Sequence, residues 1–97
     1  MSTLVTERDV FAESVRFSDD AMTVFLDDGR AITVPLAWYP RLLHGTAAER
    51  KRYELIGDGE GIHWPDLNED ISVEGILAGR RSAESDASLA TWLSKRT

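Results

Sequence analysis

A two-residue alternation of apolar and polar side chains runs through the first third of the chain and constrains its fold more than any other feature. The apolar positions recur in three short segments, at residues 11–17, 22–26 and 32–36. Because successive side chains of a β-strand point to opposite faces, each segment predicts a strand with one apolar face. In the first segment this interpretation turns Phe11, Val15 and Phe17 to the same side.

Turn-forming residues separate the three segments. Residues 18–20 read Ser-Asp-Asp, and Asp28 precedes Gly29, a pair typical of hairpins because glycine readily takes positive φ. Pro35 has no N–H to donate to a ladder, so it is expected at the end of the third strand or on a free edge. This part of the chain therefore predicts an antiparallel β-meander.

Two helical segments are predicted next. The apolar run at 37–43 predicts a short helical turn that packs Trp38, Leu42 and Leu43 against the sheet, with Gly45 as its C-cap.

Thr46 and Glu49 then have the spacing of a capping box, in which each residue bonds the backbone of the other. They predict a helix over residues 47–55, with Tyr53 and Ile56 facing inward.

The second half of the domain begins with a glycine-rich turn at 56–61, which leads into a short strand at 62–64. A further short helix is predicted over 69–78, capped by Asp70 or Ser72. Its apolar face would hold three residues at helical spacing, Val73, Ile76 and Leu77.

These elements predict an α+β fold: a small antiparallel meander of three strands plus one later short strand, with two or three short helices packed on one side. We expect a weakly ordered N-terminus at 1–9, a single domain at 10–79, and a polar linker with a short amphipathic tail helix at 80–97. The tail helix carries Leu89, Trp92 and Leu93 at helical spacing, so it is a candidate protein-binding segment.

Charge and composition limit the classes of function. The net charge is −6, so the isolated chain is not expected to bind nucleic acid. One short basic run, made of Arg50, Lys51 and Arg52, is a weak candidate for nucleic-acid contact. No cysteine is present, which excludes disulfides and thiolate chemistry. With no signal-peptide pattern and no apolar run of the ~20 residues that span a bilayer, we expect a cytoplasmic protein without membrane contact.

Polar residues around a single histidine form the candidate surface site, made of His63, Asp66, Asn68 and Asp70. Imidazole and carboxylate groups can hold a transition metal, and a raised carboxyl pKa could serve acid–base catalysis. The alternative is that the acidic residues build a turn and cap the next helix through side-chain-to-backbone hydrogen bonds. We favour the second interpretation, and predict no metal, no other cofactor and no catalytic residue.

Three motifs together resemble a bacterial family of domains of unknown function, family 2442. They are WYPRLL at 38–43, GEGIHWP at 59–65 and DISVEGILAG at 70–79. The resemblance covers about residues 10–79 and departs from the family at Asn68, where the family commonly has Asp. It implies a small α+β domain that is often encoded beside another small protein, of domain family 4160, in a pairing that looks like a toxin–antitoxin arrangement.

Three hypotheses for function follow. The preferred one is a non-enzymatic interaction or regulatory module, the antitoxin-like partner of a small basic protein from a neighbouring gene; a homodimer is a further option. The second is a small metal-binding or hydrolytic protein that uses the region of His63, Asp66 and Asp70, with Glu69 as a further carboxylate. The third is a DNA-associated regulator.

Overall fold

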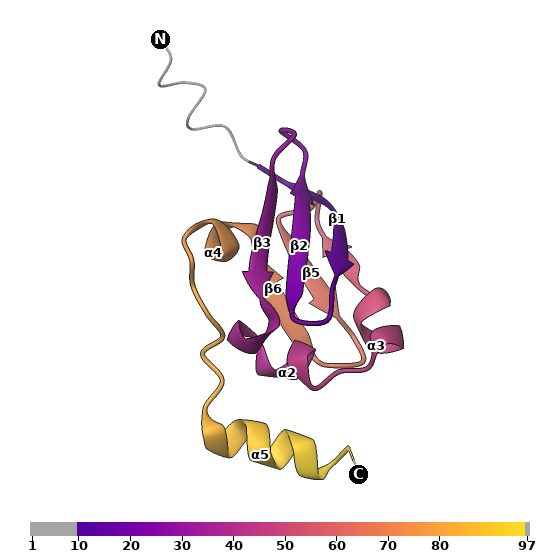
Figure 1. Cartoon of the computed structure of the whole chain (residues 1–97), viewed down its shortest axis with the longest axis vertical. Coiled ribbons are helices and arrows are strands. Elements are labelled where there is room, and N and C mark those ends of the chain that lie inside the picture. Colours follow the sequence, from indigo (N-terminus) through magenta and orange to yellow (C-terminus); the bar gives the residue numbers. More distant parts are fainter. Residues whose placement is uncertain (1–9, 97) are drawn as a thin grey trace.

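Two small antiparallel sheets form the body of the protein. A computed structural model describes residues 10–96, and Figure 1 shows the second sheet behind the first. The first sheet has the order β1-β2-β3 and the second the order β4-β5-β6. Their strands are β1 (Ala12–Phe17), β2 (Ala21–Leu26), β3 (Ala31–Pro35), β4 (Glu54–Ile56), β5 (Gly61–Trp64) and β6 (Glu69–Ser72).

Short helices lie around the edges of these sheets (Figure 1). They are the 3₁₀ turn η1 (Leu36–Trp38) and the α-helices α2 (Pro40–Leu43), α3 (Ala47–Lys51), α4 (Val73–Leu77) and α5 (Asp86–Ser94). The predicted α+β class with a β-meander is therefore confirmed. The second sheet, however, covers the inner face of the first, where the sequence predicted helices.

The meander of β1, β2 and β3 confirms the alternation seen in the sequence, and β3 ends at Pro35 as predicted. One detail differs. The pairing of β1 with β2 shifts between Ala12 and Ser14, so Glu13 is an extra residue in the strand. This bulge reverses the alternation, because Ala12 and Val15 are buried while Glu13 is exposed. Phe11 therefore does not share the inward face of Val15.

The capping box is present: the Thr46 side chain accepts from the Glu49 backbone N–H, and the Glu49 side chain accepts from the Thr46 N–H. The predicted length of that helix is wrong, because α3 ends at Lys51 and residues 54–56 form β4. Tyr53 does face inward, and its hydroxyl accepts from the Val15 N–H at 3.1 Å. Ile56 does not, with 43% of its surface exposed.

The segment predicted as one helix over 69–78 is a strand followed by a helix. Residues 69–72 pair with β5 as β6, and the helix α4 begins only at Val73. Ser72, one of the two predicted caps, accepts from the Gly75 N–H. Leu77 is 41% exposed, so it does not belong to the buried face of α4.

The turn after β3 also differs from its prediction in part. Leu42 is buried in the core, whereas Leu43 is 42% exposed. The residue at the end of α2 is His44, and Gly45 serves another purpose. A Cβ on Gly45 would lie 2.9 Å from a Leu67 methyl carbon, so glycine permits the chain to pack closely against this side chain.

One apolar core joins both sheets. Its largest member is Trp64, which has no exposed surface and donates its indole N–H to the Arg50 carbonyl at 3.0 Å. The Phe17 ring meets Trp64 edge-on, with ring centroids 6.3 Å apart. The two sheets are also joined by backbone, because the Ala12 N–H donates to the Gly59 carbonyl at 2.8 Å.

Beyond α4, the chain runs along the body before forming α5 (Figure 1). The Tyr39 hydroxyl donates to the Arg80 carbonyl, and the Ser82 N–H donates to the Trp38 carbonyl, each at 3.0 Å. A helix, α5, lies within the segment where the tail helix was predicted. The prediction for residues 1–9 lies outside the described residues. Within residues 10–96, no helix combines the length and apolar character needed to cross a membrane.

Candidate functional site

The outer face of the second sheet carries one row of polar side chains. Register places Glu54, His63 and Asp70 side by side across β4, β5 and β6. They face away from the core, since Ile62 and Ile71, which alternate with them, are buried. A hydrogen bond joins His63 Nδ1 and Asp70 Oδ1. Thus two of the four residues of the predicted surface site come together.

The other two residues of that set are used elsewhere. The Asp66 carboxylate accepts from Arg52 Nε at 2.6 Å and not from His63. Asn68 takes a left-handed conformation with φ of 51°, which an asparagine tolerates in a tight turn. Across residues 10–96, no three His, Asp or Glu side chains are grouped so that they could hold a metal ion. The four residues therefore build a turn and a cross-strand pair.

The basic run does not form one patch. The Arg50 guanidinium donates to the Leu42 and Leu43 carbonyls at 2.8 and 2.9 Å, at the end of α2. Arg52 turns to the Asp66 carboxylate. Lys51 lines a cleft together with Arg50.

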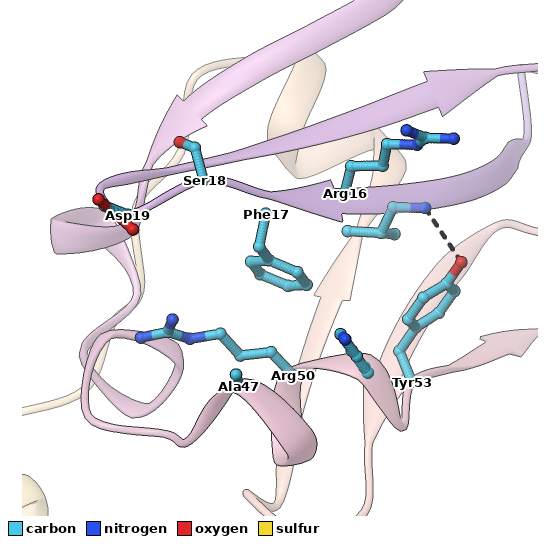
Figure 2. A pocket seen from close by; sticks show the side chains of 9 residues that line it. Arg16, Phe17, Ser18, Asp19, Ala47, Arg50 and Tyr53 are labelled. Atoms are coloured by element: carbon cyan, nitrogen blue, oxygen red, sulfur yellow. Dashed lines mark hydrogen bonds between the residues drawn. The ribbon is translucent and has the colours of Figure 1, made fainter.

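This cleft lies between the end of β1 and α3, and has a volume of about 480 Å³. Figure 2 shows Phe17 pointing from β1 toward α3, with Tyr53 to one side of it and Asp19 at the hairpin end. Nine residues line the cleft: Val15, Arg16, Phe17, Ser18, Asp19, Ala47, Arg50, Lys51 and Tyr53. Arg50 and Lys51 were predicted as site residues from the sequence but the β1 side was not, because β1 and α3 are brought together only by the tertiary fold.

A second, smaller hollow of about 250 Å³ lies between β6 and residues 80–83. Burial raises the pKa of the Glu69 carboxyl in its wall. Burial also raises the pKa of the Tyr39 hydroxyl, and the negative charge of the nearby Glu69 raises it further. Glu69 was named among the acidic residues of the second hypothesis, but neither its spacing nor its neighbours in sequence reveal its half-buried position.

The predicted tail segment packs on its own domain. The Arg41 guanidinium bonds both carboxylate oxygens of Glu84, at 2.6 and 2.9 Å, and lies 5.0 Å from the centre of the Trp92 ring. Arg96 lies 4.6 Å from that ring centre and bonds Glu49 at 2.7 Å. Leu89, Trp92 and Leu93 are each half-buried.

These ion pairs shift the pKa of the acidic partners. The hydrogen bond from Arg96 and that from the Thr46 backbone lower the pKa of Glu49 to about 2. The hydrogen bonds from Arg41 and Ser88 lower the pKa of Glu84. Both carboxylates therefore stay charged at neutral pH and hold α5 in place.

Two three-stranded sheets around one core, with short helices at their edges, define a small α+β domain. The family described as "Protein of unknown function (DUF2442)" matches residues 12–82, and the chain belongs to this family. The matched region includes every strand and α4 but ends before α5. No curated protein is similar enough to count as a match.

Two solved structures share the fold. A crystal structure of a protein of unknown function from Rhodospirillum rubrum matches with a TM-score of 0.68 and 24% identity, over 84% of this chain and 99% of that one. The solution structure of an uncharacterised protein from Chromobacterium violaceum matches with a TM-score of 0.67 and 22% identity, over 98% of this chain and 83% of the other. At these identities the likeness concerns the fold alone.

Proposed function

We propose that this protein is a non-enzymatic interaction module that binds a small basic protein on the outer face of its second sheet. The observation that carries this proposal is the row of Glu54, His63 and Asp70, which lies beside the exposed Ile56 on the edge strand β4. Carboxylates beside an apolar side chain on an accessible sheet edge suit a partner that presents basic and apolar groups together.

The position of β4 supports the same proposal. It is an outer strand of its sheet, so one side of its backbone has no neighbouring strand within that sheet. A partner can add a strand to such an edge, with main-chain hydrogen bonds giving affinity and side-chain contacts giving specificity. The negative charge of the whole chain, −6, would speed the approach of a basic partner.

The sequence made the tail helix the candidate binding segment. Its contacts within the protein favour the outer face of the second sheet instead. Two guanidinium groups of the protein already lie over the Trp92 ring. A partner that used Trp92 would have to displace them, whereas Ile56 and Glu54 are exposed without any rearrangement. The family resemblance points to a neighbouring gene as the source of the partner, which fits an antitoxin-like role.

Binding of the small basic protein encoded beside this chain tests the proposal. Isothermal titration calorimetry with Glu54→Lys should give at least about tenfold weaker binding, because a charge pair at the contact becomes a repulsion. Glu13→Lys is the matched control, since Glu13 is an equally exposed strand glutamate on the other sheet. Equal weakening by both variants, or no binding by the wild-type chain, would rule out the proposed surface.

A further inference from the structure

The cleft between β1 and α3 has the size and the mixed lining of a small-molecule site. Its volume of about 480 Å³ lies within the roughly 300–1,000 Å³ that such sites occupy. Phe17 and Tyr53 supply aromatic surface, and Arg16, Arg50 and Lys51 supply positive charge. Flat apolar walls with a few cations are a combination that recognises an anion carried on a ring.

Arg50 is held rigidly in this wall. Its Nε and Nη2 donate to the two carbonyls at the end of α2, and its backbone carbonyl accepts the Trp64 indole N–H. A guanidinium has five N–H donors, so most of them have no acceptor among the described residues. Backbone carbonyls also leave its full charge unneutralised. A guanidinium fixed in this way loses little entropy when it bonds an anion.

Within the part of the chain that the structure describes, the cations of this cleft form no ion pair, although the Arg50 guanidinium lies 6.0 Å from the centre of the Phe17 ring. Four arginines elsewhere pair with carboxylates: Arg30 with Asp28, Arg41 with Glu84, Arg52 with Asp66 and Arg96 with Glu49. Arg81 instead lies over the Trp38 ring. Among residues 10–96, Arg16, Arg50 and Lys51 have no carboxylate within ion-pair distance, although they gather on one cleft of an acidic protein. Three cations outnumber Asp19, the one carboxylate that lines the cleft, so the cleft carries a net positive charge that attracts an anion.

We propose that this cleft binds a small organic anion, a carboxylate or phosphate group attached to a flat apolar body. The anionic group bonds the fixed guanidinium of Arg50 and the ammonium of Lys51, and the flat body packs on Phe17 and Tyr53. Asp19 also lines the cleft, at its hairpin end (Figure 2), and disfavours a second negative charge on the ligand there. This site is separate from the outer face of the second sheet, so either proposal can fail alone.

NMR titration of the ¹⁵N-labelled full chain tests the site with four probes: phenylphosphate, benzoate, inorganic phosphate and benzyl alcohol. We expect saturable shifts of the amides of residues 15–19 and 47–53 and of the Trp64 indole, with a Kd at or below the millimolar range. Phenylphosphate against benzoate distinguishes the two anionic groups. Inorganic phosphate and benzyl alcohol should each bind at least about tenfold more weakly, since each lacks half of the recognised chemistry. The proposal is overturned if inorganic phosphate or benzyl alcohol binds as tightly as the aromatic anions. It is also overturned if no probe saturates the shifts by about 10 mM.

Two lysines provide a matched pair of variants. Lys51→Glu should weaken binding of the better probe at least about tenfold, the loss expected for one charge-assisted hydrogen bond. Lys95→Glu makes the same charge change at the end of α5, at a residue that does not line the cleft, and should leave the Kd within about twofold. If both variants weaken probe binding equally, the probe responds to the overall charge of the protein and the proposed site is wrong. Asp19→Asn should tighten binding, and the Trp64 indole resonance verifies that each variant is folded.

Discussion

The two-sheet body and the tail helix α5 of this protein are stabilised by different forces. The buried apolar residues all lie between Ala12 and Ile76, and none of them belongs to α5. What holds α5 is the pairing of Glu84 with Arg41 and of Glu49 with Arg96, the guanidinium groups over Trp92, and the packing of the half-buried Trp92 against the core. The body is held mainly by the removal of apolar surface from water, whereas charged groups carry a larger share of the stabilisation of α5.

This difference teaches that the two regions should respond to different perturbations. Burial of apolar surface contributes roughly 25 cal/mol per Å² and depends little on pH or salt. Exposed and half-exposed ion pairs contribute little each and weaken as salt rises. The body should therefore stay folded under conditions that release α5, and the family match, which ends at residue 82, has the same boundary.

The largest effect is expected in the core of the body. Trp64→Ala should destabilise the protein by about 3–5 kcal/mol, because it leaves a cavity under both sheets and removes the ring contact with Phe17. Urea denaturation measures this loss. Phe25→Ala, at an exposed position of β2, is the control and should cost less than about 1 kcal/mol. A similar small loss for Trp64→Ala would contradict the central place of this residue.

The next effect concerns the close packing of Gly45. Gly45→Ala should destabilise the body by about 1–3 kcal/mol, because the added methyl group meets Leu67 at 2.9 Å and the Arg41 carbonyl at 3.2 Å. Thermal unfolding measures the change. Adding Leu67→Val should recover part of the loss if the clash is its cause. A neutral or stabilising Gly45→Ala would show that the Leu67 side chain can turn aside.

A smaller and more local effect is expected in the tail. Trp92→Ala removes the ring beneath two guanidinium groups and should cost about 1–2 kcal/mol of α5 docking. Hydrogen exchange should then show faster exchange of the α5 amides and unchanged protection in β2 and β5. Lys95→Ala, at the exposed end of the same helix, should change neither. Loss of protection throughout the body would mean that α5 and the sheets unfold as one unit.

The smallest effect is a pH dependence of the tail. The pKa of Glu49 is about 2 in the folded protein against an ordinary 4.5, so its contribution is complete above 4.5 and is lost as the pH falls toward 2. Tryptophan fluorescence of a Trp38→Phe variant, compared with its Trp92→Phe counterpart, should follow the release of α5 in this range. Glu49→Gln should reduce this dependence to the part that Glu84 contributes, while the body titrates as before. A transition of the same size in Glu49→Gln would assign it to other carboxyls.

The sequence predicted the meander because alternation and turn chemistry act locally. It did not predict β4 and β6, because three or four residues are too few to show a period, and residues 47–55 also satisfy a helix. The capping box fixed the start of α3 correctly, while its end was set by the pairing of Glu54 with His63 in another strand. Local signals define where elements start, and tertiary pairing decided where this one stopped.

The candidate sites show the same limit. That Asp66 and Asn68 form a turn followed from their residue types. That Asp66 pairs with Arg52, and Asp70 with His63, depends on the register of three strands. The cleft of Phe17 and Lys51 joins segments more than thirty residues apart, so no spacing in the sequence could reveal it.

Gly59 joins the two sheets, and the tolerance of that position to substitution follows from its geometry. Its φ is +112°, and a Cβ there would lie 2.4 Å from the Ala12 carbonyl oxygen, which belongs to backbone and cannot turn aside. In a library that varies residue 59 among all twenty amino acids, selection for folded protein should return glycine alone. Gly79, with φ of +76° but open space around it, should admit asparagine as well. Two glycines of similar conformation would thus differ sharply in their freedom to evolve.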